Sequence, residues 1–193
     1  MFTPVFRILT AAAVMGIALS PGAASAVALR PAALSYWSSN TPSGGDPDTT
    51  VTFAVTTGAL SMSAPASANL GSGAPGTTIS GALGAVTVTD DRALLVASWT
   101  ATASSSNFTT GGGTPAETIP VTDATYTPGT ITTTGTITAT GTPITLAHGG
   151  ATVVAGTAGV GDNTATWNPN IAVAVPASAV GGDYTGTLTQ SVA

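Results

Sequence analysis

The stretch VTVTDDRALLVASWTATA at residues 86–103 decides the fold of this chain. Val86 and Val88 alternate with threonines, which is the two-residue period of a strand that buries one face. Further on, alternate residues again share one apolar face, namely Leu95, Ala97, Trp99, Ala101 and Ala103. Between the two runs, Asp90, Asp91 and Arg92 form a dense charge cluster in a chain of which 6% is charged. The pattern predicts two strands joined by a charged turn.

Alternation also marks the chain on the N-terminal side of this stretch. Residues 51–55 predict a strand whose apolar side chains are Val51, Phe53 and Val55. A second short strand is expected at residues 60–62, beyond Gly58, as its antiparallel neighbour. Residues 64–76 are rich in glycine and proline and read as a loop.

The C-terminal part repeats the same arrangement of short apolar runs and turn residues. Strands are predicted at residues 151–155 and 164–167, with a turn between them, and a closing strand at residues 183–193. No stretch after the N-terminus shows a helical period. Short alternating strands separated by regular turn signals are typical of an all-β fold. We therefore predict a single antiparallel β-sandwich of the immunoglobulin-like kind.

The first residues read as a targeting signal and not as part of the fold. Arg7 precedes an apolar run at residues 8–19, and Ala24-Ser25-Ala26 fits the small-residue cleavage pattern. The run is shorter than the ~20 residues that a membrane-spanning helix needs. The sequence therefore predicts a signal peptide at 1–26, an extension or linker at 27–48, a domain at 49–193, and a secreted product without a transmembrane anchor.

Composition excludes several classes of partner and of cross-link. The chain has no cysteine and no lysine, so disulfides and lysine isopeptide cross-links are excluded. After cleavage, Arg30 and Arg92 face eight carboxylates, which gives a net charge of -6 (2 minus 8). Nucleic-acid binding depends on Lys and Arg, so nucleic acid is not expected as a partner. The 37 threonines suit either an O-glycosylated stalk or a threonine-coated β-domain, and the apolar alternation favours the domain.

No catalytic, cofactor or metal site is predicted, and we do not expect an enzyme. His148 is the single histidine, no G-x-S-x-G elbow is present, and zinc would lack ligands. Aspartates are expected in loops, where oxygen ligands suit calcium, but their spacing matches no calcium loop. They are Asp46, Asp48, Asp90, Asp91, Asp162 and Asp183.

Five other side chains have a structural interpretation. Arg92 is expected to pair locally with the neighbouring aspartates at a strand end. Trp99 and Trp167 lie on alternating strand faces and are expected in the core, and Phe108 is expected to plug it from a loop. Gln190 shares the apolar face of the closing strand, so it should be hydrogen-bonded or lie near an open end of the sandwich.

The pairing of VTVTDDR and SWTA with a terminal GGDYTGTLTQSVA resembles the WxL-type domains of Gram-positive cell-surface proteins, and especially their secreted actinobacterial relatives. The resemblance covers residues 49–193 and includes NPNIAVAVPASAVGGDYTG. It implies a β-sandwich and, from other members of the family, non-covalent attachment to peptidoglycan. The first Trp-x-Leu motif falls on Trp99-Thr100-Ala101, and the second falls on Gln190-Ser191-Val192, where the tryptophan is absent.

The function predicted from these observations is that of a secreted, non-enzymatic cell-surface protein, associated with the wall without a covalent bond or structural in role. Peptidoglycan or another wall glycan, or other surface proteins, are the expected partners. Two alternatives stay open. One is a released protein that binds a glycan or an ion. The other is a filament subunit that adds a strand to its neighbour from residues 27–35.

Overall fold

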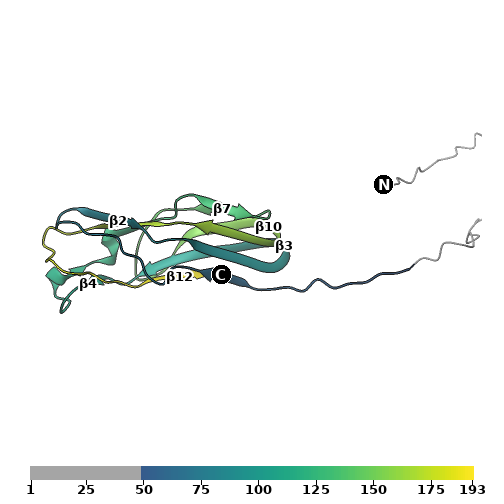
Figure 1. The fold of residues 1–193 in the computed structure, drawn as a ribbon, viewed down its shortest axis with the longest axis horizontal. Coiled ribbons are helices and arrows are strands. Elements are labelled where there is room, and N and C mark those ends of the chain that lie inside the picture. The colour runs from purple at the N-terminus through teal and green to yellow at the C-terminus, as the bar shows by residue number, and fades with distance from the viewer. Residues whose placement is uncertain (1–48) are drawn as a thin grey trace, which may run out of the picture. The chain divides into compact units, whose positions relative to one another are not determined.

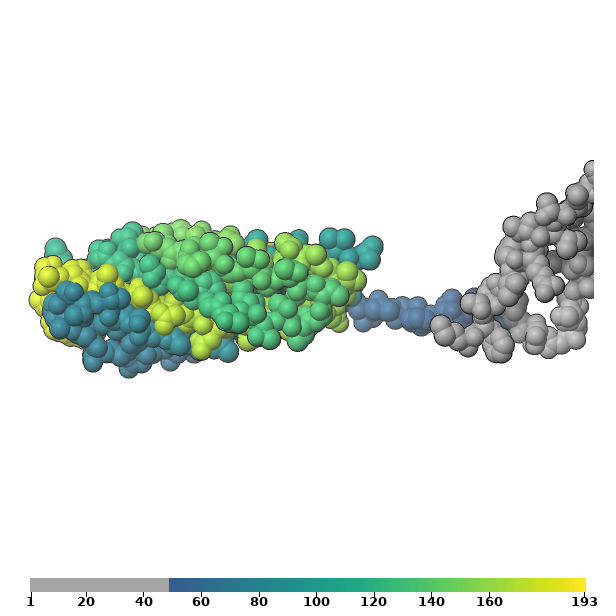
Figure 2. All heavy atoms as spheres, turned by 90° about the horizontal axis from the view of Figure 1, so that it is seen from above, coloured from purple at the N-terminus to yellow at the C-terminus, as the bar shows by residue number. Residues whose placement is uncertain are grey.

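The computed structural model describes residues 49–193. The predicted signal peptide and linker, together with Trp37, Asp46, Asp48 and the donor strand expected at residues 27–35, lie outside the described residues. The chain divides into two units, Met1–Val51 and Thr52–Ala193. The second unit is an elongated body of strands (Figures 1 and 2).

The predicted all-β fold is confirmed. The strands are β1 (Leu60–Ser63), β2 (Thr78–Ala82), β3 (Val86–Ser105), β4 (Phe108–Thr109), β5 (Thr118–Ile119), β6 (Ala124–Thr127), β7 (Ile131–Thr134), β8 (Thr138–Gly141), β9 (Ile144–Thr145), β10 (Ala151–Trp167), β11 (Asn170–Ala174) and β12 (Leu188–Val192). Two 3₁₀ turns, η1 (Pro115–Glu117) and η2 (Val121–Asp123), interrupt them. Among the described residues, no helix has the length and apolar character to cross a membrane.

The strands form antiparallel sheets. The largest follows the order β1-β3-β10-β7, with β12 also paired to β3 and β8 also paired to β10. A four-stranded sheet has the order β2-β11-β6-β9, and β4 pairs with β5. The two longest strands, β3 and β10, therefore pair with each other, and every other strand of the largest sheet pairs with one of them.

Both long strands double back on themselves. β1 pairs with β3 through Asp90, and β12 pairs with the same edge of β3 from Ala101 onward. On a straight strand these positions would lie about 36 Å apart, at ~3.3 Å per residue, yet β1 and β12 contact one another. The two halves of the β3–β10 ladder therefore face each other across the core, and the strands turn at the end of the body labelled β3 and β10 in Figure 1.

The bend replaces the two predicted turns. We expected separate strands before and after residues 90–92, and again before and after residues 156–163. Instead one ladder runs through each region, with register shifts between Gly156 and Asn163. Two non-glycine residues take a left-handed conformation there, Ala93 with φ 52° and Ala158 with φ 58°.

The bend also overturns one assignment of face. Leu95 was expected to share the buried face of Ala97 and Trp99, but it is 81% exposed. Buried positions change from even numbers at Val86 and Val88 to odd numbers from Ala97 onward. The extra residues of the bend cause this change, because a strand that gains one residue inverts its faces.

The core lies between the two halves of the folded ladder and under the four-stranded sheet. Trp99 and Trp167 are 3% and 2% exposed, which confirms that both are core residues. Tyr126 from β6 is fully buried beside them. Phe108, as expected, packs against this core, from the short strand β4.

The strand predicted at residues 51–55 is wrong. These residues are extended but belong to no strand, and Val51, Phe53 and Val55 are 78%, 87% and 76% exposed. The bend of β3 gives the physical reason. Gly58 N donates to Asp91 O at 2.7 Å, and Ala59 O accepts from Asp91 N at 3.1 Å. β3 turns away directly after Asp91, so the residues before Gly58 have no strand to pair with among residues 49–193.

Candidate functional site

The bend of β3 is closed by one ion pair. Arg92 Nε and Nη2 donate to the two carboxylate oxygens of Asp90, each at 2.8 Å, and Nη2 also donates to Ser98 O at 2.8 Å. The Asp90 side chain is 1% exposed and that of Arg92 is 29% exposed. The hydrogen bond from Arg92 lowers the pKa of the Asp90 carboxyl, against burial, which raises it. The expectation that Arg92 pairs locally is confirmed, although β3 continues past it.

The bend of β10 is held by a buried amide. Asn163 is the register partner of Asp90 and is 2% exposed. Its Oδ1 accepts from Thr136 N at 2.8 Å and from Ile137 N at 3.1 Å, while its Nδ2 donates to Gly161 O at 2.8 Å. Buried polar groups are stable when their hydrogen bonds are made. Asp90 and Asn163 therefore fix the shape of the bend.

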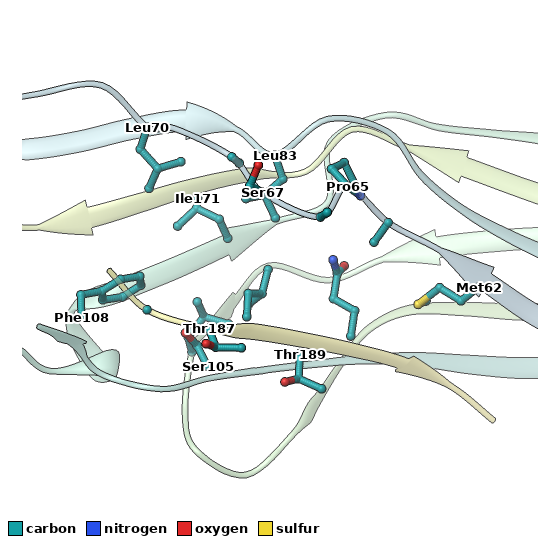
Figure 3. A pocket seen from close by; sticks show the side chains of 17 residues that line it. Met62, Pro65, Ser67, Leu70, Leu83, Ser105, Phe108, Ile171, Thr187 and Thr189 are labelled. Atoms are coloured by element: carbon teal, nitrogen blue, oxygen red, sulfur yellow. The ribbon is translucent and has the colours of Figure 1, made fainter. Parts of the chain in front are cut away.

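Away from the bend, an open groove runs along one edge of the sandwich, with a volume of about 530 Å³. One wall is residues 64–70 and the other is residues 186–190. Met62 lies at one end and Phe108 at the other, as Figure 3 shows. The apolar floor includes Leu83, Leu146 and Ile171. All 17 lining residues are uncharged.

The wall at residues 64–70 has the predicted loop character, but it is extended along the groove. Within the described part of the chain, no backbone hydrogen bond is made by these seven residues. Their N–H and C=O groups therefore face solvent or the groove. Such an unpaired edge beside an apolar floor suits an extended chain, which would supply both backbone partners and apolar side chains.

Gln190 connects the groove with the core. Its Oε1 accepts from Tyr126 Oη at 2.9 Å, and Tyr126 Oη accepts from Trp167 Nε1 at 2.9 Å. Gln190 also lines the groove. The prediction that this residue is hydrogen-bonded or near an open end of the sandwich is confirmed by its hydrogen bond. Burial raises the pKa of Tyr126 to about 12, so its hydroxyl stays protonated.

A regular array of hydroxyl groups covers the outer surface of one half of the folded ladder. Each of its four strands, β1, β3, β10 and β7, contributes two alternate residues, and the register aligns them in two rows. We call this array the hydroxyl face, and its members are Ser61, Ser63, Thr87, Thr89, Thr132, Thr134, Thr164 and Thr166. Two hydrogen bonds cross its strands, Thr87–Thr166 at 3.0 Å and Thr134–Thr164 at 2.6 Å.

The remaining candidates from the sequence do not come together. His148 is exposed in the turn before β10 and borders a shallow depression lined by neutral residues. Asp90, Asp91 and Asp162 lie in β3 and β10, so the expectation that they sit in loops is wrong, while Asp183 lies outside the strands as expected. Within residues 49–193, no group of three or more acidic or histidine side chains is arranged to hold a metal ion.

Sequence reasoning missed the groove, and it predicted a threonine-coated β-domain without locating the hydroxyl face. The face had a signal, because Ser-x-Ser or Thr-x-Thr recurs in four separate places that become neighbouring strands. The groove had none, because its walls are 116 or more residues apart (186 minus 70) and meet only in the folded domain.

No protein-family model, no curated protein and no solved structure matches the chain. The resemblance to WxL-type domains stays a prediction from the motifs quoted above.

Proposed function

We propose that this chain is a secreted, non-enzymatic module of the cell surface that associates with wall glycan without a covalent bond, through its hydroxyl face. The observation that carries the proposal is the alignment of eight hydroxyl side chains in two rows on one side of a sheet. Neighbouring strands lie ~4.8 Å apart, and alternate residues ~6.7 Å apart. The face therefore presents donors and acceptors at regular intervals.

The chemistry of this face suits a neutral, hydroxyl-rich polymer. Each serine or threonine hydroxyl donates one hydrogen bond and accepts up to two, and a glycan offers the complementary groups. The two tryptophans among the described residues lie in the core, so they are not available to stack on sugars. An acidic protein gains nothing from ion pairs with an anionic wall, which leaves hydrogen bonds as the source of affinity.

The charged groups with shifted pKa values have structural partners, which supports a binding role over a catalytic one. Asp90 and Arg92 pair with each other at the bend. Glu117 accepts from Thr114 N at 3.0 Å, and this hydrogen bond lowers the pKa of its carboxyl. The alternative of a filament subunit is favoured by one separate observation, the exposed apolar residues before β1.

Co-sedimentation with peptidoglycan tests the proposal. The secreted chain should bind weakly, and the bound fraction should hold or rise from low to physiological salt, because salt screens the repulsion between like charges. In Thr132→Val/Thr134→Val, which keeps the β-branched shape, loss of two hydrogen bonds at about 1 kcal/mol each should weaken binding about 30-fold. Thr127→Val/Thr145→Val, at exposed strand positions of the other sheet, is the matched control.

Three results would count against the proposal. Binding abolished by salt would mean that ion pairs carry the contact. Binding abolished by a chelator would favour the alternative of an ion-binding protein. No binding under any condition would remove the wall-associated function altogether.

A further inference from the structure

Residues 50–57, TVTFAVTT, form an extended apolar segment that pairs with no strand among residues 49–193, and we call it the overhang. Its three large apolar side chains alternate, and each is more than three-quarters exposed: Val51 at 78%, Phe53 at 87% and Val55 at 76%. Figure 2 shows the part from Thr52 onward leaving the body of the domain as a single extended segment. An extended apolar strand without a neighbour is a template for pairing with another chain.

Residues 52–57, the part of the overhang in the second unit, are directed away from the groove of that unit. The two hydrogen bonds between Asp91 and the Gly58–Ala59 pair continue the line of β1 as far as the bend of β3. Gly58 allows this close approach, because a Cβ at that position would meet the Cβ of Asp91 at 2.7 Å. These bonds set the direction in which the overhang leaves the body, and in this structure it does not lie in the groove of its own molecule.

The groove offers the overhang an apolar surface and unpaired backbone groups. It offers an apolar floor and a wall at residues 64–70 whose backbone groups have no partner among the described residues. The overhang and the lining of the groove both carry no charge, so the contact buries no charged side chain. We propose that the overhang of one copy lies as an added strand in the groove of a second copy.

This arrangement goes beyond the proposed association with glycan, and it uses a different surface. The overhang lies at the bend, whereas the groove lies along the edge between β1 and β12. A contact between two different surfaces is head-to-tail, and it produces an open chain when its rotation does not close a ring. Each copy in such a chain gives one strand and receives one.

Sedimentation velocity and light scattering of the secreted chain, across an about hundredfold concentration range in the micromolar region, test the proposal. We expect assembly that grows with concentration. Phe53→Ser/Val55→Ser should weaken it at least about tenfold, because the apolar side chains no longer gain from burial. Thr52→Ser/Ala54→Ser, on the opposite side of the overhang, is the matched control and should assemble as the wild type does.

The groove is tested from the other side with Ala66→Glu, which places a carboxylate in the exposed wall. Ala177→Glu adds the same charge outside the groove and serves as its control. Circular dichroism checks that each variant is folded. A synthetic peptide of residues 49–58 should bind the Phe53→Ser/Val55→Ser variant, whose groove is intact, and should not bind Ala66→Glu.

Mixing separates the head-to-tail contact from other arrangements. The donor variant and the groove variant should each stay monomeric alone and should form a 1:1 complex together, because one intact overhang and one intact groove remain. Assembly of Ala66→Glu by itself would show that two overhangs pair with each other, and it would overturn the proposal. A wild type that is monomeric throughout, with Phe53 protected in its own molecule, would also overturn it.

The same samples keep this test independent of the glycan proposal. Thr132→Val/Thr134→Val should assemble as the wild type does, although its binding to peptidoglycan is expected to fall. If the wild type binds peptidoglycan but does not assemble, the proposed strand contact is wrong and the glycan proposal stands. If it assembles but does not bind peptidoglycan, the glycan proposal is wrong and the strand contact stands.

Discussion

The bend at one end of the sandwich and the groove along its edge differ in how their polar groups are paired. At the bend, Asp90 and Asn163 are buried, and every side-chain donor and acceptor that is buried in the described residues has a partner. Along the groove, residues 64–70 cover the edge without a backbone hydrogen bond to any other described residue. The comparison indicates that the bend is a fixed structural feature, whereas the groove edge is left available for another chain.

The largest expected effect on stability comes from removing the ion pair at the bend. Arg92→Ala leaves the Asp90 carboxylate buried without its cation, and breaking a buried pair in this way costs about 3–5 kcal/mol. Urea unfolding measures the change in the free energy of unfolding. Arg92→Lys keeps the charge but loses the two-pronged contact, so it should fall between the wild type and Arg92→Ala. A loss below about 1 kcal/mol would show that the bend does not depend on this pair.

A smaller effect is expected where the core meets the groove. Tyr126→Phe leaves Trp167 Nε1 without its acceptor and Gln190 Oε1 without its donor, which should cost about 1–2 kcal/mol. Gln190 borders the open groove, so water can replace the hydroxyl on that side and the cost stays below that at the bend. The measurement is again urea unfolding, with Tyr184→Phe as the control because its hydroxyl bonds two backbone carbonyls outside the core, those of Ala116 and of exposed Val180. Unchanged stability of Tyr126→Phe would contradict the contrast between the two regions.

The smallest effect is the dependence of stability on acid. The folded pKa of Asp90 is lowered, so its contribution is present above the ordinary value of about 3.9 and is lost as the pH falls through the folded value. The free energy of unfolding should therefore stay level from about pH 7 to 5 and decline below about pH 4. Glu117, whose pKa is also lowered, adds a decline of the same sign.

Asp90→Asn isolates the part that belongs to the bend, because Glu117 titrates in both proteins. The decline in acid should be shallower in Asp90→Asn than in the wild type when both are followed by urea unfolding at each pH. Equal slopes would mean that the Asp90–Arg92 pair is not what couples stability to protonation.

The sequence predicted the local part of this structure well. The alternation around Trp99 and Trp167 identified their buried faces, and the period of the closing strand placed Gln190 on the inner face near an opening. These predictions rest on the direction of successive side chains in a strand, which the sequence contains directly. The loop at residues 64–76 was predicted for a similar reason, since glycine and proline disfavour regular strands.

By itself, then, the sequence determined the all-β class, the buried faces around Trp99 and Trp167, and the local pairing of Arg92. Only the tertiary structure decided that β3 and β10 each double back as one ladder, because that depends on contacts such as Arg92 with Ser98 and Asn163 with Ile137. The bend in turn removed the partner of residues 50–57 and brought β1 against β12 to form the groove. The alternation of side chains specifies which side of a strand is apolar. Which strand covers that side depends on where the other strands begin and end in the folded domain.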